Sequence, residues 1–332
     1  MALVRQRLHT EKLEDIAGAV TKALSGLQLM EGAHPGESVA VAVGSRGIAD
    51  LAVVVSQCVN LLKNKGFEPF VVPAMGSHGG NTSEGESSVL SRLGIDESTV
   101  GAPIRAGGDP KQIGALEVGI PILMDKHAAE ADHLVVINRV KPHTKFHGPV
   151  ESGLTKMLTI GLGKGKGAAL YHQAAVRHTF SILQDAARKI LEDKSVLFGL
   201  AIVEDGCGNV SRMSAVRPGD WLETEQTLLK EARLAVASIP FDALDILIVD
   251  EIGKDISGIG MDSNVTGRHR DIVGDFCIAP HVKRIFVRGL SPGSDGNGNG
   301  IGLADVTTQR LVEALDLEKT SAHALTAISP EK

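Results

Sequence analysis

The stretch VAVAVGSRG at residues 39–47 is a short run of β-branched and small apolar residues that ends in a polar turn with glycine. Five later stretches share this plan, an apolar run followed by polar or glycine-containing residues. They are PFVVPAMG (69–76), HLVVINRV (133–140), LFGLAIVED (197–205), ALDILIVDEIG (243–253) and RIFVRGL (284–290). Apolar residues at helical spacing lie between or beside them, at about 11–28, 48–65, 167–192, 223–237 and 306–317. Strands that alternate with helices predict an α/β fold of mostly parallel sheets flanked by helices.

Length and composition fit two domains of this kind. The chain has 332 residues, of which 43% are apolar and 22% are charged, as is usual for a globular protein. Ala237-Ser238-Ile239-Pro240 follows a long helical segment and precedes a new strand. We therefore predict an N-terminal domain at 1–238 and a C-terminal α/β domain at 239–332, with the active site in the cleft between them.

Charge, cysteine content and hydropathy exclude several classes of protein. The formal net charge is −6 and no long basic block occurs, so we expect no nucleic-acid partner. Cys58, Cys207 and Cys277 are spaced too widely for a disulfide framework or a CxxC zinc site. The first residues lack the apolar core of a signal peptide, and no run of about 18 apolar residues exists. We expect a cytoplasmic protein that does not bind a membrane.

Two polar residues directly follow predicted strands. Arg46 comes after the first strand, where a guanidinium suits a carboxylate or a phosphate, although an arginine that caps a loop is the competing interpretation. His78 lies in a Gly-Ser-His-Gly-Gly turn after the second strand. A lone loop histidine is more often a surface residue, but ligands bind at the carboxyl ends of strands in such sheets. We therefore favour a functional role for both.

The densest group of polar residues is VKPHTKFHGPVESGLTKMLTIGLGKGKGAALYHQAAVRH at 140–178, with four histidines and five lysines. Its GLGKGKGA loop (161–168) opens a helix and is either solvated surface or an anion site made by backbone N–H groups. The loop is not a Walker A motif, because neither Lys164 nor Lys166 precedes Ser or Thr, and its glycines do not fit GxGxxG. His172 alone is typical of a hydrogen-bonded helix histidine, and His147 is either a base or a packing residue.

The same stretch resembles the lactate racemase family. The residues that carry the resemblance are AAEAD (128–132), the strand after it, His143, Ser152-Gly153-Leu154-Thr155-Lys156, and His172 sixteen positions after Lys156. Upstream, Arg46 and His78 follow successive strands as the family's substrate-binding arginine and first catalytic histidine do. The resemblance extends from about residue 35 to about residue 305. It implies a racemase or epimerase of a 2-hydroxy acid.

The resemblance also implies a nickel-pincer nucleotide, a pyridinium mononucleotide with a thioamide and a thiocarboxylate that hold nickel. In this family the cofactor is attached to a lysine, here Lys156, and one histidine, here His172, binds the nickel. Soft sulfur donors with one imidazole suit square-planar nickel. The resemblance makes residues 1–238 the cofactor-binding domain. Further cofactor contacts are expected from Ser45, Gly79, Gly163 and Asp262.

The implied reaction is a reversible hydride transfer. A base takes the hydroxyl proton while the hydride leaves for the pyridinium ring, and two histidines, here His78 and His143, alternate as base and acid on opposite sides of the substrate. Imidazole suits this task because it titrates near pH 7. The expected substrate-binding residues are Arg46, Lys254 and Asn264.

Two departures from the family leave alternatives open. Three extra residues separate His143 from Lys156, so His147 is a second candidate base. The family's second domain has a tyrosine–glutamine pair followed by a substrate-binding lysine, whereas the nearest segment here, Gly260–Val265, has no lysine. Lys254 is a candidate replacement, and the identity of the hydroxy acid stays open.

Two other functions compete with the racemase. One is a nucleotide- or phosphate-binding transferase that uses GLGKGKGA and Arg46, although no carboxylate pair for magnesium lies near that loop. The other is a non-catalytic protein that binds a nucleotide or a metal. The racemase interpretation implies a small 2-hydroxy acid and the cofactor-synthesis enzymes as partners, and leaves a homo-oligomer open.

Overall fold

The computed structural model describes residues 3–27, 33–144, 147–268 and 280–321, which form two compact units. The large unit comprises Leu8–Lys141 and Gly148–Ala235, and the small unit comprises Met1–Arg7, Pro142–His147 and Val236–Lys332. The chain therefore leaves the large unit after residue 141 and re-enters it at residue 148. The domain division at residue 238 stays a prediction. Among the described residues, no helix is both long and apolar enough to cross a membrane.

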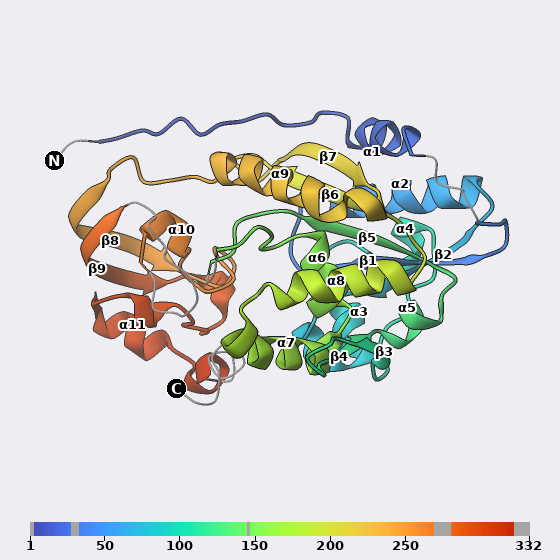
Figure 1. The fold of residues 1–332 in the computed structure, drawn as a ribbon. Coiled ribbons are helices and arrows are strands. Elements are labelled where there is room, and N and C mark those ends of the chain that lie inside the picture. The colour runs from blue at the N-terminus through green and yellow to red at the C-terminus, as the bar shows by residue number, and fades with distance from the viewer. Residues whose placement is uncertain (1–2, 28–32, 145–146, 269–279, 322–332) are drawn as a thin grey trace. The chain divides into compact units, whose positions relative to one another are not determined.

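The large unit is built on a five-stranded sheet in the order β2-β1-β5-β6-β7 (Figure 1). Its strands are β1 (Ser38–Val43), β2 (Glu68–Pro73), β5 (His133–Arg139), β6 (Val196–Glu204) and β7 (Val210–Val216). Neighbouring strands are parallel except β7, which runs antiparallel to β6. Val43 pairs with Pro73 of β2 and with Ile137 of β5, so the carboxyl ends of these three strands share one edge. The prediction of a mostly parallel α/β sheet is confirmed.

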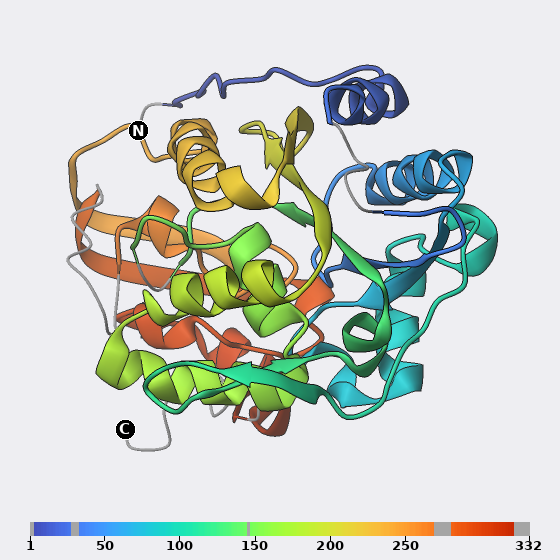
Figure 2. The same ribbon diagram turned by 45° about the vertical axis from the view of Figure 1, so that its right-hand side comes forward.

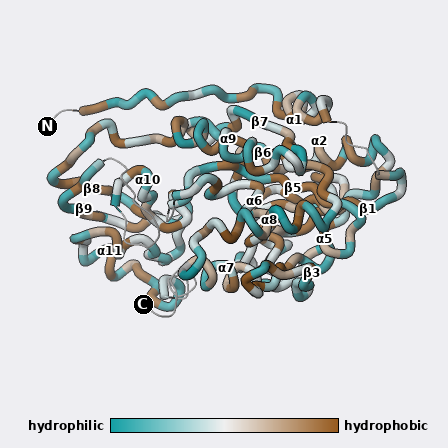
Figure 3. The backbone as a smooth tube through the Cα atoms, in the orientation of Figure 1, coloured by the Kyte–Doolittle hydropathy of each residue, from teal (hydrophilic) through white to brown (hydrophobic). Residues whose placement is uncertain are grey.

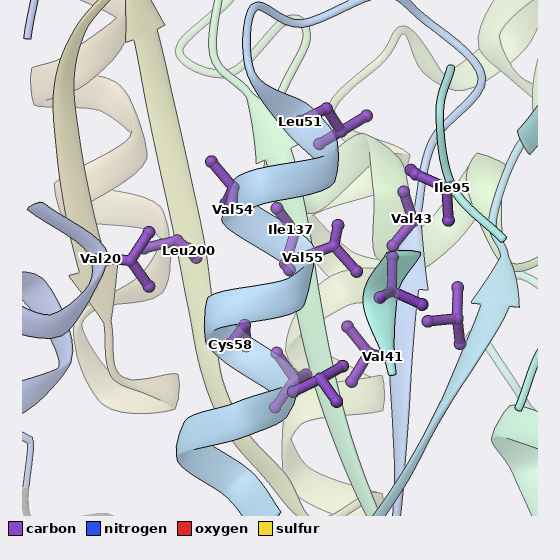
Figure 4. Packing of buried hydrophobic residues seen from close by; sticks show 14 of the residues in the cluster. Val20, Val41, Val43, Leu51, Val54, Val55, Cys58, Ile95, Ile137 and Leu200 are labelled. Carbon is purple, nitrogen blue, oxygen red and sulfur yellow. The ribbon is translucent and has the colours of Figure 1, made fainter. Parts of the chain in front are cut away.

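Helices cover both faces of this sheet (Figure 1 and Figure 2). One face packs against α1 (Ile16–Ser25), α2 (Leu51–Asn64) and α4 (Glu97–Val100), and the other against α6 (Leu154–Lys156), α8 (Ile182–Asp193) and α9 (Trp221–Ala235). In Figure 4, Val55 of α2 lies close to Val41 and Ile137 of the sheet. Strands buried on both faces are mainly apolar, with polar residues at their ends, whereas the covering helices mix apolar and polar residues (Figure 3).

The large unit has further elements, which come between the named strands and helices in the sequence. They are the 3-10 turn η1 (His78–Asn81), α3 (Ser83–Arg92), β3 (Lys111–Ala115), β4 (Pro121–Met124), α5 (Lys126–Glu130), the π-helix η2 (Met157–Gly161), α7 (Lys164–His178) and the 3-10 turn η3 (Pro218–Asp220). β3 and β4 form an antiparallel pair. A small separate core joins Ile160 of the π-helix to Tyr171 of α7 and Leu183 of α8. This core fixes α7 to the segment that follows Lys156.

The small unit contains a three-stranded parallel sheet in the order β10-β9-β8. Its elements are β8 (Ala243–Ile252), α10 (Ser263–Thr266), β9 (His281–Leu290), η4 (Pro292–Ser294), η5 (Ile301–Leu303), β10 (Val306–Thr307) and α11 (Gln309–Ala314). Gly260 has a φ of 83°, and a Cβ there would overlap the carbonyl oxygen of Asn299. The loops after β8 and β9 therefore touch through their backbones.

The structure differs from the sequence-based prediction in several elements. The helix expected over 167–192 is two helices, because Thr179 adopts a φ of 57° between α7 and α8. The segment 306–317 begins as strand β10 before α11. Strand β7 was not expected, because its sequence VSRMSAV is partly exposed and carries polar residues, and α3, β3, β4 and α5 were not expected either. Partly exposed strands with polar residues are usual at an antiparallel sheet edge.

Candidate functional site

Ser45 and His78 connect the carboxyl ends of β1 and β2. The Ser45 hydroxyl is 2.5 Å from Nδ1 of His78. His78 opens the turn η1, in which Gly79 adopts a φ of 73°. A Cβ on Gly79 would lie 2.8 Å from the backbone nitrogen of Glu86, so only glycine lets this turn press against α3. The structure thus brings together Ser45 and His78, which were both expected at the site. Gly79, which is predicted to contact the cofactor, also allows η1 to pack against α3.

Arg46 lies in a region of positive charge. Solvent reaches its side chain, but partial desolvation, together with the charge of Arg139, lowers the pKa of the guanidinium. Arg139 at the end of β5 itself pairs with Glu204. This surplus of positive charge at the edge of the sheet suits an anionic group such as a carboxylate or a phosphate.

Lys156 ends the short helix α6 and is directly followed by the π-helix η2. Its side chain is half-buried. Burial, and to a smaller extent the charges of Arg46 and Lys141, lower the pKa of its amine to about 8. A lysine in this state is partly neutral near pH 7, which makes its nitrogen a usable nucleophile. π-helices are rare and often occur at functional sites.

The segment before Lys156 is held by buried polar groups. Asn138 donates a hydrogen bond of 2.8 Å to the carbonyl oxygen of Gly153. Thr155 donates from its backbone N and its Oγ1 to Oε2 of Glu225, at 2.9 and 2.6 Å. Sequence reasoning missed Glu225, although a signal existed. Glu225 shares the apolar face of α9 with Trp221 and the buried leucines of that helix, where a carboxylate is unusual.

His172, the predicted nickel ligand, lies on α7 with its side chain exposed. Its ring meets the ring of Phe180 edge to face, with centroids 6.5 Å apart. Gly163, a predicted cofactor contact, precedes α7, and a Cβ there would lie 2.5 Å from the carbonyl oxygen of Thr159. Within the described ranges, no group of three or more His, Cys, Asp or Glu side chains is arranged to hold a metal.

Both lysines of the GLGKGKGA loop form ion pairs with carboxylates of the protein itself. Lys164 is buried, with its Nζ 2.8 Å from Glu86 and 2.9 Å from Asp125, and it donates to the carbonyl oxygen of Pro73 at 2.9 Å. Lys166 is exposed and pairs with Asp109 at 2.8 Å. These contacts give Lys164 a structural role. They do not favour the interpretation of the loop as a phosphate site.

The remaining predicted residues belong to the small unit. Asn264 donates a hydrogen bond of 3.2 Å to the carbonyl oxygen of His143, and Ser263 donates to that of Thr144. Asp262 caps α10 by accepting a hydrogen bond from the backbone of Asn264. The short helix α10 therefore binds the backbone at His143 and Thr144, shortly before His147 in the chain.

Two features of this group bear on its predicted role in binding the substrate. Oδ1 of Asn264 is buried and has no hydrogen-bond partner among the described residues. Lys254 follows β8 and is half-buried. Lys254 thus lies just after the carboxyl end of a parallel strand, which is where α/β sheets bind ligands, whereas Asn264 follows on α10.

Comparison with known proteins identifies the family. A family model for the lactate racemase N-terminal domain matches residues 3–182, which is more than half of the chain. The chain belongs to the lactate racemase family. The matched range contains the predicted residues of the large unit, namely Ser45, Arg46, His78, Gly79, Lys156, Gly163 and His172.

A solved structure agrees with this family in fold. The lactate racemase apoprotein from Thermoanaerobacterium thermosaccharolyticum is similar to this chain, with a TM-score of 0.54 and 15% sequence identity. The similarity covers 83% of this chain and 68% of that chain. No curated protein sequence matches the chain.

Proposed function

We propose that this chain is a racemase or epimerase of a small 2-hydroxy acid, with a nickel-pincer nucleotide as its cofactor. Membership of the lactate racemase family supports a racemase. The observation that carries the finer proposal is Lys156, which occupies the position of the family's cofactor-bearing lysine and has a pKa of about 8. In this proposal the enzyme acts in the cytoplasm, where the cofactor-synthesis enzymes are its partners.

The surroundings of Lys156 fit such a cofactor. Burial keeps a fraction of the amine neutral, as the formation of a covalent bond to nitrogen requires. Arg46 and Lys141 add positive charge that favours a group with a phosphate and a thiocarboxylate. Lys156 would carry the nucleotide, His172 would bind the nickel, and Ser45, Gly79, Gly163 and Asp262 would contact the rest. When bound, this cofactor supplies a reversible acceptor for a hydride.

The protein's own groups handle the proton and the carboxylate. His78 would take the hydroxyl proton of the substrate, and its hydrogen bond to Ser45 orients the ring and uses Nδ1, so Nε2 is the nitrogen that we assign to the transfer. Arg46 would bind the carboxylate through two parallel hydrogen bonds. His143 is the proposed second acid–base group, with its backbone held by Asn264. Asn264 and Lys254 are proposed to bind the substrate.

The test is an isotope experiment with a metal analysis. Protein produced together with the cofactor-synthesis enzymes should contain nickel and about two additional sulfur atoms, as this donor set requires. It should racemise a 2-hydroxy acid that carries deuterium on C2 while keeping the deuterium on carbon. Protein produced without those enzymes is the control and should be inactive. Loss of deuterium to water during turnover would contradict the hydride mechanism and support a carbanion mechanism instead.

A further inference from the structure

A buried carboxylate lies against the segment that carries Lys156. Glu225 on α9 is 1% exposed, and α9 packs against α6. One carboxylate oxygen, Oε2, accepts both hydrogen bonds of Thr155. A Cβ on Gly153 would overlap the other oxygen, Oε1, so the carboxylate fits closely against this glycine. Glu225 therefore touches the chain at two of the three positions before Lys156.

This arrangement is unfavourable for stability alone. Oε1 of Glu225 is buried and has no hydrogen-bond partner within the described part of the chain. Burial raises the pKa of the carboxyl to about 7, although the hydrogen bonds from Thr155 and the nearby backbone N–H of Leu154 lower it. Replacing a buried ionisable group by a well-packed apolar side chain is often neutral or stabilising. A buried carboxyl with an unpaired oxygen in this position therefore calls for an explanation beyond packing.

We propose that Glu225 is a positioning residue for Lys156. By holding the amide and the hydroxyl of Thr155, the carboxylate fixes the single turn of α6. This keeps the lysine amine in its half-buried place beside Arg46 and Lys141. The inference rests on the proposed function, in which Lys156 bears the cofactor. Glu225 acts through Thr155 and the backbone of α6.

The test measures the reactivity of Lys156 in the apoprotein. An N-hydroxysuccinimide ester labels the protein across a pH series, and peptide mass spectrometry gives the pH of half-maximal labelling at Lys156. We expect this pH to be near 8 in the wild type. In Glu225→Ala it should rise toward that of an ordinary lysine, and a rise of about one unit means roughly ten-fold less neutral amine below that pH.

Two further variants make this test specific. Glu225→Gln keeps an acceptor for Thr155, so its shift should be clearly smaller than that of Glu225→Ala. Glu223→Gln changes an exposed carboxylate on the same helix and should leave the labelling curve unchanged. If Glu225→Ala does not fold, Thr155→Val removes one of the two hydrogen bonds and should give a smaller rise.

Several results would overturn the inference. An unchanged half-maximal pH in Glu225→Ala or Thr155→Val would mean that the carboxylate only supports the fold. A fall of this pH, equal in Glu225→Ala and Glu225→Gln, would mean that the charge of Glu225 acts on Lys156 rather than its position. Failure of the proposed function looks different, because the nucleotide would then be missing from Lys156 in co-produced wild-type protein whatever the labelling curves show.

Discussion

Lys156 and Lys164 are eight positions apart in the large unit, but their surroundings are opposite. Lys164 is fully buried and contacts two carboxylates, Glu86 and Asp125. Lys156 is half-buried, and the charges that act on its pKa are those of Arg46 and Lys141. Glu225, a buried carboxylate that contacts the segment before Lys156, binds the hydroxyl and the amide of Thr155 instead.

The difference shows how one residue type serves two purposes. Carboxylates around a buried ammonium group make it a structural cation that connects α7 to β2, α3 and α5. Burial without a carboxylate, and with cations nearby, makes the amine easier to deprotonate and therefore a nucleophile. Sequence alone left the glycine-rich loop of Lys164 open as either an anion site or solvated surface, whereas the charges in the structure favour an anion near Lys156.

The largest expected effect on stability comes from removing the ammonium group of Lys164, whereas removal of the Lys156 amine should cost nothing. Lys164→Met leaves two buried carboxylates without their cation and should lower the free energy of unfolding by about 3–5 kcal/mol. Lys156→Met removes a partly desolvated charge beside two other cations, so stability should stay the same or rise. Denaturant unfolding measures both, and Lys166→Met, which breaks only an exposed ion pair, is the control. Equal losses in Lys156→Met and Lys164→Met would refute the contrast.

The second comparison is between the proposed acid–base histidines, His78 and His143, and His147, which we expect to have no role in proton transfer. His78→Ala and His143→Ala should each slow racemisation by about 100-fold or more, the usual scale for a general base. His147→Ala should cost far less, because it lies on the same 142–147 segment without acting as the base. Rates with a panel of 2-hydroxy acids decide between them. If His147→Ala is inactive while His143→Ala still turns over, the assignment of the second base is wrong.

A smaller effect concerns stability against pH. The pKa of Glu225 is raised from 4.5 to about 7 in the folded state. A raised carboxyl pKa contributes stability below the unfolded value, and this contribution is lost as the pH rises through the folded value. Between pH 4.5 and 7, the wild type should therefore lose on the order of 2 kcal/mol relative to Glu225→Gln.

The sign of this pH effect tests the surroundings of Lys156. If Glu225 formed an ion pair with Lys156, its pKa would be lowered, and stability would rise with pH instead. Denaturant unfolding of both proteins at several pH values gives the answer. Glu223→Gln should show the same pH dependence as the wild type, because its carboxylate is exposed.

Much of the fold could be predicted because buried parallel strands carry continuous apolar runs. β1, β2, β5, β6, β8 and β9 each begin and end within a few residues of the segments expected from the sequence. The break at Thr179 could not be predicted, because it depends on a left-handed backbone at a residue that is not glycine. β7 was missed because an edge strand with polar residues has no strong apolar signal.

The residues of the candidate site could be predicted only where their position after a strand, or their spacing in the sequence, indicated a role. Strand ends and the spacing of Lys156 and His172 pointed to the residues that the family model covers. Glu225 was not predicted, because it contacts Thr155 although the two residues are 70 positions apart in the sequence. The ion pairs of Lys164 were not predicted for the same reason, because Glu86 and Asp125 lie far from Lys164 in the sequence. Contacts of this kind depend on tertiary packing.

The most direct test of the account is to locate the cofactor by mass. Wild-type protein, Lys156→Ala and Lys166→Met are each produced together with the cofactor-synthesis enzymes, and intact mass and peptide maps are recorded. We predict an added mass on the peptide that contains Lys156 in the wild type and in Lys166→Met. Lys156→Ala should show no added mass and no racemisation. An adduct that persists in Lys156→Ala, or that maps to Lys164, would contradict the central claim.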